Sequence, residues 1–349
     1  MTEKLDTQKL LHVLDEYNRL GITSQIDYNK FYLYSLITHS TAIEGSTVTE
    51  IENQLLFDEG IAAKGRTMQE QLMNLDLKKA YEQSMRLARL HQDFSVDLLK
   101  SLSAVVMANT GSSYNTIQGS FDASKGDLRL LLNVTAGAGG KSYMNFVKVP
   151  SKLEDFCTII NQERKRLLST QNVIEQYRLS FDAHYRLVTI HPWADGNGRM
   201  SRLVMNQIQF EFGLVPSKVI KEDKADYIQA LIESRECDES SPFCEFMFRE
   251  HVKNLEIEIE NYKESLDGSR KSSQKSSQKG SQKSSQKIIE RMADNPAITT
   301  QELADELGVS RRTIAKHVKQ LQMRGFVMRI GPDKGGHWEV VNSEWNEDE

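Results

Sequence analysis

The chain has 349 residues, of which 39% are hydrophobic, and its 44 basic and 49 acidic residues give a net charge of −5 at pH 7. This length exceeds one usual domain and allows a large core plus a small second unit. The negative charge argues against tight nonspecific binding to DNA, and three cysteines are too few for a disulfide framework and indicate no catalytic thiol.

The first residues of the chain carry no targeting signal. Residues 1–6 read Met-Thr-Glu-Lys-Leu-Asp, which is polar and acidic rather than typical of a signal peptide. No apolar run in the sequence is long enough to cross a bilayer. We therefore expect a cytoplasmic protein without a membrane partner.

The predicted N-terminal helical region, residues 1–95, contains a helix end at Gly45. Residues 40–45 read Ser-Thr-Ala-Ile-Glu-Gly, and a glycine commonly ends a helix because it adopts a left-handed conformation easily. Taken alone, this pattern favours a surface helix whose Glu44 side chain lies in solvent.

Two β-prone runs flank a glycine-rich connection in the middle of the chain. Residues 128–135 and 142–149 lie on either side of Ala-Gly-Ala-Gly-Gly, and this arrangement predicts a β-hairpin over residues 128–149. The glycines do not form a P-loop, because the glycine required five residues before Gly140 is missing.

Residues 175–190 are predicted to form a central core helix, since apolar residues recur there every three and four positions. His184 lies on this helix, where a hydrogen-bonded packing histidine is favoured over a metal ligand. No other histidines or cysteines stand at ligand spacing, so the sequence predicts no zinc site.

The segment from His191 to Arg202 reads His-Pro-Trp-Ala-Asp-Gly-Asn-Gly-Arg-Met-Ser-Arg. Its glycine-rich turn, Gly196, Asn197 and Gly198, lacks bulk or tolerates positive φ, so backbone N–H groups can converge on an anion. The residues that follow contain no helix breaker, which places the turn at a helix N-terminus, where negative charge is favoured.

The charged side chains of this segment suit the polyphosphate of a nucleotide. Arg199 and Arg202 share one helix face, and each guanidinium can bind phosphate oxygens through two hydrogen bonds. Asp195 can hold Mg²⁺, and His191 can accept a proton near neutral pH from an attacking hydroxyl. A capped helix after a structural turn would explain any one residue, but their combination indicates an active site.

Composition changes within residues 266–287, where four tetrapeptides such as Ser-Ser-Gln-Lys follow one another without an apolar residue. A stretch of this kind buries nothing. We therefore expect a solvated basic linker that is flexible or weakly helical.

Residues 288–345 are predicted to form a winged-helix domain of α+β type. Thr299 or Thr300 caps a second helix, and a turn at Gly308 leads to a third, basic helix. β-prone runs follow over 326–330 and 337–341. The residues predicted to contact DNA from the third helix are Arg311, Arg312, Thr313 and Lys316. Winged helices also bind proteins, so a protein partner stays an alternative to DNA.

Residues 191–202 resemble the signature of the Fic family, with Trp193 in place of the usual phenylalanine and an aromatic packing role expected for it. Fic enzymes mostly transfer AMP from ATP to a protein hydroxyl, a reaction called AMPylation. The resemblance implies a mainly α fold, with a helical Fic catalytic core over residues 96–265. The hairpin over 128–149 would be a flap along which a target protein docks by adding a strand.

The resemblance also implies a role for each signature residue, with ATP as substrate and Mg²⁺ as cofactor. His191 would be the general base, and Asp195 would hold Mg²⁺. The residues implied in binding the ATP phosphates are Gly196, Asn197, Gly198, Arg199 and Arg202. Tyr227 and Ser234 lie where related enzymes contact the adenine base, although Tyr227 fits a core position equally well.

Residues 40–45 resemble the inhibitory motif of the same family through Ser40, Glu44 and Gly45, with Ser46 where asparagine is usual. A carboxylate of Glu44 against Arg202 would neutralise the charge meant for the γ-phosphate, so that ATP could bind only in an unreactive pose. Because this motif precedes the signature, the resemblance implies the subclass with an N-terminal inhibitory helix.

The sequence therefore predicts an autoinhibited protein adenylyltransferase, a nucleotidyltransferase that modifies a Ser, Thr or Tyr hydroxyl of another protein or of the chain itself. One alternative is a de-AMPylating hydrolase in which Glu44 orients a water. Another is a DNA-binding transcriptional regulator whose Fic core only senses nucleotide. The sequence leaves open whether the protein forms a homodimer.

Overall fold

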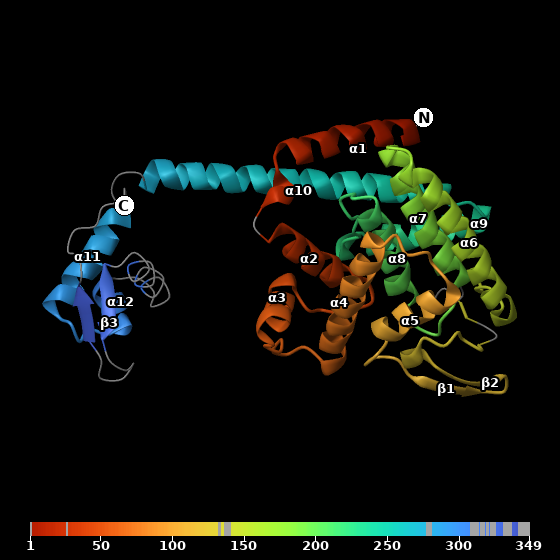
Figure 1. Ribbon diagram of the computed structural model, residues 1–349, viewed down its shortest axis with the longest axis horizontal. Coiled ribbons are helices and arrows are strands. Elements are labelled where there is room, and N and C mark those ends of the chain that lie inside the picture. The colour runs from red at the N-terminus through yellow and green to blue at the C-terminus, as the bar shows by residue number, and fades with distance from the viewer. Residues whose placement is uncertain are drawn as a thin grey trace. The chain divides into compact units, whose positions relative to one another are not determined.

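The structure is a computed structural model. It describes residues 2–25, 27–131, 134–135, 141–276, 281–307, 314, 318, 321, 326–330 and 337–340. The chain divides into two compact units, Met1–Glu260 and Asn261–Glu349. Both are built mainly from helices, and each contains one small β-hairpin (Figure 1). The predicted fold class is therefore confirmed. In the part of the chain that is described, no helix is both long and apolar enough to cross a membrane.

The first unit begins with helices that pack on its core. They are α1 (Thr2–Arg19), η1 (Ile22–Ser24), α2 (Tyr28–Ile43), α3 (Glu50–Glu59) and α4 (Met68–Arg89). Capping boxes start two of them, because Thr49 pairs with Glu52 at α3 and Thr67 pairs with Glu70 at α4. Each box satisfies two backbone or hydroxyl groups that the helix start would otherwise leave unpaired.

The remaining helices that begin in this unit include α8, which packs on α2, α4, α5 and α7. They are α5 (Val96–Val106), α6 (Val149–Leu168), α7 (Val173–Ile190), α8 (Asn197–Glu211), α9 (Lys224–Cys237) and α10 (Ser241–Ser276), with short 3₁₀ helices η2 (Ala123–Lys125), η3 (Phe146–Lys148) and η4 (Lys221–Asp223). Helix α8 lies between α4 and α7 and packs on both (Figure 1). The predicted helix over 175–190 is α7, but α8 is the more enclosed of the two, with 13 of its 15 residues buried.

Polar residues on a buried helix need partners, and two of those on α8 find them on neighbouring helices. Tyr81 on α4 donates to Asn206 at 2.7 Å, and Gln209 donates to Ser180 on α7 at 2.9 Å. A buried polar group left without a hydrogen bond would cost about 1–3 kcal/mol. These bonds therefore fix the rotation of α8, and with it the direction in which its first turn points.

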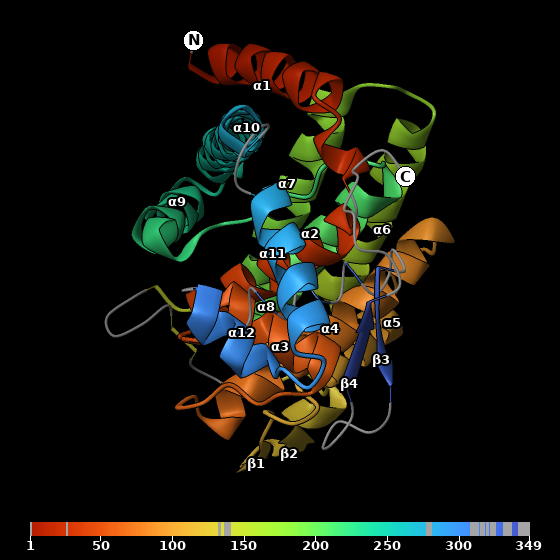
Figure 2. The ribbon, with the colours of Figure 1, turned by 90° about the vertical axis from the view of Figure 1, so that its left-hand side faces the viewer.

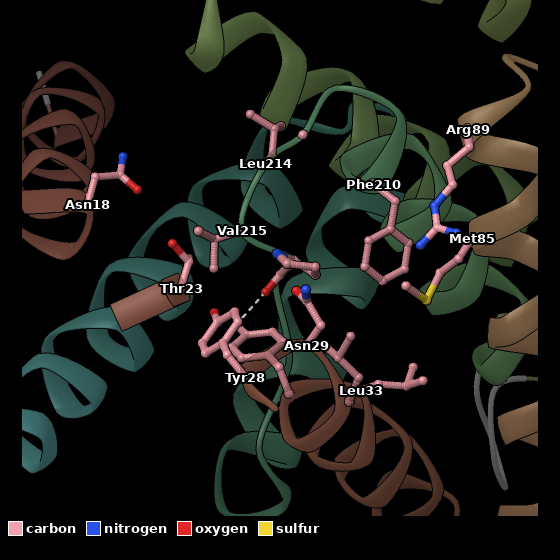
Figure 3. Close-up of a pocket in the computed structure, with 14 residues that line it drawn as sticks. Asn18, Thr23, Tyr28, Asn29, Leu33, Met85, Arg89, Phe210, Leu214 and Val215 are labelled. Atoms are coloured by element: carbon pink, nitrogen blue, oxygen red, sulfur yellow. Dashed lines mark hydrogen bonds between the residues drawn. The ribbon is translucent and has the colours of Figure 1, made fainter. Parts of the chain in front are cut away.

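Helix α2 is held at its N-terminal half by a loop that follows α8. The Tyr32 hydroxyl donates to the Pro216 carbonyl at 2.7 Å beside a cavity of about 470 Å³, whose other walls include Met85 and Phe210 (Figure 3). None of the residues lining this cavity belongs to the segment 191–202. The hydrogen bond to Pro216 holds α2 in place, and the last residues of α2 reach α8.

The β-hairpin of the first unit lies where the sequence analysis placed no strand. Strands β1 (Ser113–Thr116) and β2 (Gly119–Asp122) pair antiparallel across a two-residue turn. Gly119 has a φ of 127°, a conformation that favours glycine. The sequence feature that could have indicated these strands is the alternation of Tyr114 and Phe121 with polar residues. The rings of these two residues stack with centroids 4.8 Å apart.

The predicted flap over 128–149 is shorter at its end than expected. An antiparallel bridge joins Thr135 to Ser142, and the Tyr143 N–H donates to the Val134 carbonyl at 2.7 Å. The second strand was predicted to reach residue 149, which is wrong. Residues 146–148 form η3, and Val149 begins α6, because Asn145 caps the turn and a proline stands in the first turn of the helix. Residues 132–133 and 136–140 lie outside the described residues.

The second unit contains α11 (Ser281–Asp294), α12 (Thr300–Leu307), β3 (Val327–Ile330) and β4 (His337–Val340) (Figure 2). Thr299 caps α12 with Glu302 in reciprocal bonds, and β3 pairs antiparallel with β4 as predicted for a wing. The Trp338 indole donates to the Ile298 carbonyl at 3.0 Å and ties the wing to the helices.

Two further predictions from the sequence concern this region. The Ser/Gln/Lys repeat contributes the end of α10, up to Ser276, and the start of α11. The four residues predicted to contact DNA lie outside the described residues. Of the third helix, the described Ile314, Val318 and Leu321 are helical and buried in the core of this unit.

We predict that Glu211→Ala destabilises the first unit by about 3–5 kcal/mol, because the change leaves Arg164 buried without its charge partner. The two side chains are almost fully buried and joined by bonds of 2.5 and 2.7 Å. Urea unfolding followed by circular dichroism measures the effect. Glu163→Ala is the control, since it breaks an exposed pair with Arg166 and should cost about 0–1 kcal/mol. Equal losses in both variants would contradict the prediction.

Candidate functional site

The segment 191–202 forms a tight turn between α7 and α8. His191 ends α7 in a left-handed conformation with a φ of 52°, and Gly196 precedes α8 with a φ of 79°. The glycine-rich turn therefore lies at a helix N-terminus, as predicted. The N–H groups at the start of α8 and the helix dipole favour an anion at this point.

Two side chains hold the turn in shape. Trp193 is fully buried and donates its indole N–H to the Gly126 carbonyl at 3.2 Å, so its predicted packing role is confirmed. The Asn197 amide bridges the turn, accepting from the Trp193 N–H at 3.1 Å and donating to the Trp193 carbonyl at 2.9 Å. Asn197 thus shapes the anion-binding turn from within.

The glycines of the turn are required by close neighbours. A side chain at Gly196 would bring its Cβ within 2.6 Å of the Met107 sulfur, and a Cβ at Gly198 would lie 2.5 Å from a carboxylate oxygen of Glu44. Both distances are shorter than carbon atoms tolerate. The contact at Gly198 shows that the end of α2 presses directly on the first turn of α8.

Arg202 joins these two elements. Its guanidinium lies 2.5 Å from a carboxylate oxygen of Glu44, which follows the last residue of α2. It also donates to the Ser40 hydroxyl at 2.8 Å and to the Ser40 carbonyl at 2.9 Å. Gly45 comes next with a φ of 105° and turns the chain away. Residues 40–45 taken alone favoured a solvated Glu44, but the family resemblance implied a contact with Arg202, and the structure contains that contact.

The charges of this pair stabilise one another. Burial raises the pKa of Glu44, but the charge and hydrogen bond of Arg202 lower it more, so that the net pKa lies below its ordinary value. Burial acts against the charge of Arg202, yet Glu44 raises the pKa of the guanidinium above its ordinary value. Both groups are therefore ionised at neutral pH, and neither charge is available to a ligand while the pair is intact.

Arg199 lies close by but is less well paired. Only 2% of it is exposed, and its Nη2 lies 3.2 Å from the Met107 sulfur and 3.6 Å from an Asp195 carboxylate oxygen. Within the described residues, its Nε and Nη1 have no hydrogen-bond partner. Burying a guanidinium with unpaired donors costs free energy. An anionic ligand bound at the turn would supply the missing acceptors.

Asp195 is the acidic group of the turn. One of its oxygens accepts the Gly196 N–H at 2.6 Å, and 59% of the side chain is exposed. The described residues contain no group of three His, Cys, Asp or Glu that could hold a metal ion. One exposed carboxylate fits Mg²⁺ in the form in which proteins bind it together with substrate phosphates.

His191 has the geometry of a proton acceptor. Its Nδ1 lies 3.4 Å from the Val188 carbonyl, which favours the tautomer with its proton on Nδ1 and a lone pair on Nε2. Burial lowers the pKa of His191 to about 4, and the charges of Arg129 and Arg235 act in the same direction. The imidazole is therefore neutral at pH 7 and able to accept a proton.

Arg129 was not singled out from the sequence. It is 1% exposed and donates to the His191 carbonyl at 2.6 Å and to the Met144 carbonyl, while its own N–H donates to the Pro192 carbonyl at 2.9 Å. It thus ties the flap segment to the turn behind the histidine. The sequence feature that could have identified Arg129 is a single arginine within an apolar run, since burying such a group requires several acceptors.

Tyr227 and Ser234 on α9 are both buried. The Tyr227 hydroxyl lies 3.0 Å from Nε2 of His184 and 3.3 Å from Nη1 of Arg202, which confirms His184 as a packed, hydrogen-bonded histidine. The Ser234 hydroxyl accepts the Phe243 N–H at 2.9 Å at the start of α10. Tyr227 thus contacts the site through its hydrogen bond to Arg202. Contact of Tyr227 or Ser234 with adenine stays a prediction.

Comparison with known proteins agrees with this geometry. Residues 93–209 match the Fic/DOC family, and residues 284–336 match an HTH domain. The chain therefore contains a segment that matches the Fic/DOC family, followed by a C-terminal segment that matches an HTH domain.

Among distant relatives, protein adenylyltransferase fic-1 of Caenorhabditis elegans is 25% identical over 222 residues, which are 62% of this chain and 40% of the relative. Protein adenylyltransferase Fic of Drosophila mojavensis is 27% identical over 228 residues, 63% of this chain and 40% of that protein. The chain thus matches less than half the length of these relatives.

Two solved structures share the fold. A Fic domain containing signaling protein from Bacteroides thetaiotaomicron superposes with a TM-score of 0.57 at 19% identity, covering 75% of this chain and 97% of that one. A Fic family protein from Desulfovibrio desulfuricans gives a TM-score of 0.53 at 17% identity, covering 97% of each chain.

We predict that Glu44→Gln lowers the free energy of unfolding by about 1–3 kcal/mol at neutral pH, because Arg202 loses a charged partner. Since the pKa of Glu44 is lowered from 4.5 on folding, the contribution of its charge is complete above pH 4.5 and is lost as the pH falls through the lowered value. The difference between wild type and variant should therefore shrink below pH 4.5. Urea unfolding at a series of pH values measures it, and a difference that does not depend on pH would contradict the prediction.

Proposed function

We propose that this chain is a protein adenylyltransferase that transfers AMP from ATP to a Ser, Thr or Tyr hydroxyl of a protein and is inhibited by its own Glu44. The observation that carries the proposal is the gathering of a neutral histidine, a glycine turn and two buried arginines at the start of α8, with Glu44 on one of the arginines. The named activity of the distant relatives supports it.

The proposed reaction exchanges a phosphoanhydride bond of ATP for a phosphoester bond to the target. The target hydroxyl oxygen forms a bond to the α-phosphorus of ATP, the bond from that phosphorus to the β-phosphate bridging oxygen breaks, and pyrophosphate leaves. Nε2 of His191 accepts the hydroxyl proton. The N–H groups of the turn and the incompletely paired guanidinium of Arg199 bind the phosphate oxygens, whose negative charge matches both.

Mg²⁺ fits this proposal through Asp195, whose exposed carboxylate lies beside Arg199. When bound, the ion would neutralise part of the polyphosphate charge. Binding, orientation and proton transfer at the target hydroxyl remain the work of the turn, Arg199 and His191.

Inhibition follows from the position of Glu44 on Arg202, where its carboxylate takes an Nη2 donor and neutralises the guanidinium charge. The Nε and Nη2 of Arg202 are used by Ser40 and Glu44, and its Nη1 by Tyr227. A terminal phosphate can bind Arg202 only if it displaces the Glu44 carboxylate, because both are anions that need the same donors. We propose that ATP therefore binds without its outer phosphate on Arg202 and is not aligned for attack.

Labelling with ATP that carries ³²P on its α-phosphate tests this function. Glu44→Gly should increase label on protein in the presence of Mg²⁺, because Arg202 becomes free. Glu44→Gly/His191→Ala should lower the rate by about 10²- to 10⁴-fold, the usual contribution of a general base. Glu59→Gly is the matched control, since Glu59 also ends a helix before a glycine but is exposed, and it should not change the rate.

The outcome also decides between the alternatives retained from the sequence. If no variant labels any protein while wild type removes AMP from a modified protein and Glu44→Gly does not, the chain is a hydrolase that needs Glu44. If nucleotide binds but neither reaction occurs, the Fic domain is a sensor. Either result would contradict the transferase proposal.

The HTH domain match supports DNA binding as a second function of the chain. Arg311→Ala/Arg312→Ala should weaken binding of the full chain to its DNA and reduce the salt slope of the affinity by about 1 per arginine. Fluorescence anisotropy with duplexes selected from genomic fragments measures both. If no fragment is enriched over random duplex at physiological salt, DNA binding is excluded and a protein partner is favoured.

A further inference from the structure

Two side chains from distant parts of the chain stack in turn over the predicted base, His191. The ring of Tyr143 lies parallel to the His191 imidazole, with centroids 3.7 Å apart and an angle of 15° between the planes. The guanidinium of Arg235, on α9, lies 4.2 Å from the Tyr143 ring centroid. Tyr143 is therefore in contact with both the histidine and a planar cation.

Arg235 also binds the backbone that carries this tyrosine. Its Nη2 donates to the Lys141 carbonyl at 3.1 Å and to the Ser142 carbonyl at 3.0 Å, and Nζ of Lys141 donates back to the Arg235 carbonyl at 3.1 Å. Helix α9 thus clamps the two residues that precede Tyr143. A contact made by one ring alone would be weak, but three hydrogen bonds and a stacked cation give it a defined position.

The backbone of Tyr143 is fixed on its other side as well. Its N–H donates to the Val134 carbonyl at 2.7 Å, and Arg129 donates to the Met144 carbonyl that follows. Arg129 binds the His191 carbonyl at the same time. The tyrosine and the histidine are therefore held against each other through Arg129 as well as through their rings.

This arrangement leaves His191 a poor proton acceptor. Tyr143 covers one face of the imidazole, and the cations Arg129 and Arg235 lie nearby. The Val188 carbonyl, which faces Nδ1, and the carboxylate of Glu44 act on the pKa of the histidine in the opposite sense, but burial outweighs them. Burial together with positive charge disfavours the imidazolium that forms when the target hydroxyl gives up its proton.

We propose that Tyr143, clamped by Arg235, is a second brake that covers His191 and acts independently of the contact between Glu44 and Arg202. The inference rests on the proposed function, in which His191 accepts the proton. The two contacts act on different groups, one on the phosphate-binding arginine and one on the base. Their effects on the rate should therefore multiply, and removing Glu44 should release only part of the activity.

The first test measures the cover without relying on catalysis. Diethyl pyrocarbonate modifies uncovered neutral histidines, and mass spectrometry of the peptide that contains His191 gives the rate at this residue. Tyr143→Ala should raise that rate about twofold to tenfold, the range that the free energy of one aromatic pair allows. Arg235→Ala should raise it in the same direction, and Arg235→Lys should behave like Arg235→Ala because lysine cannot stack or reach both carbonyls.

A matched control accounts for loss of structure. Tyr114→Ala also removes a stacked, partly exposed tyrosine, but its partner is Phe121 in the β1–β2 hairpin, and it should leave the rate at His191 unchanged. Circular dichroism identifies any variant that has not folded. If the rate at His191 is the same in Tyr143→Ala, Arg235→Ala and wild type, Tyr143 does not cover the histidine and the inference is overturned.

The second test asks whether the cover restrains the reaction. In the Glu44→Gly background, Tyr143→Ala should increase AMP transfer about twofold to tenfold. If modification of His191 becomes faster but transfer becomes slower, Tyr143 is a positioning residue for the base and not a brake. If Glu44→Gly transfers no AMP at all, the proposed function fails, and the modification rates then show whether Tyr143 covers His191.

Discussion

The ion pair between Arg202 and Glu44 connects the N-terminal helices to the segment 191–202. Arg202 points from the second turn of α8 to the end of α2, where Ser40 and Glu44 bind it with three contacts between 2.5 and 2.9 Å. Neither charge could be buried alone without a large cost in free energy. The position of α2 and the state of the phosphate site are therefore set by the same interaction.

A protein can build such a site only if the helix that carries it is held rigidly. Helix α8 is enclosed on nearly all sides, and its amide side chains bond to α4 and α7. Arg164 and Glu211 fix its far end to α6. This support lets the first turn keep Arg199 buried with two nitrogens unpaired within the described residues, a state that favours an incoming anion.

On the other side of the turn, His191 is neutral because it is buried, and the backbone around it is also held rigidly. Trp193 and Arg129 anchor the backbone around His191. They thereby hold the backbone of this residue beside the ring of Tyr143. Reactivity then depends on which side chains lie against the arginines and the histidine. Small movements of α2 or of the segment around Tyr143 would change it without altering the core.

The sequence by itself determined the turn and the helix that follows it, because glycine conformation and helix start signals act over a few residues. It also singled out the residues proposed to bind phosphate. It also determined the packing role of Trp193, the cap at Thr299 and the wing. It did not reveal the β1–β2 hairpin, whose polar strands carry little pattern, and it extended the second strand of the flap into η3 and α6. The contact of Glu44 with Arg202 was implied by the family resemblance and not by residues 40–45 alone, and the tertiary structure supplied its geometry. Only the tertiary structure brought Arg129, Tyr143 and Arg235 to His191. Those contacts join residues far apart in the chain, and their geometry depends on how whole helices pack, which no local pattern encodes.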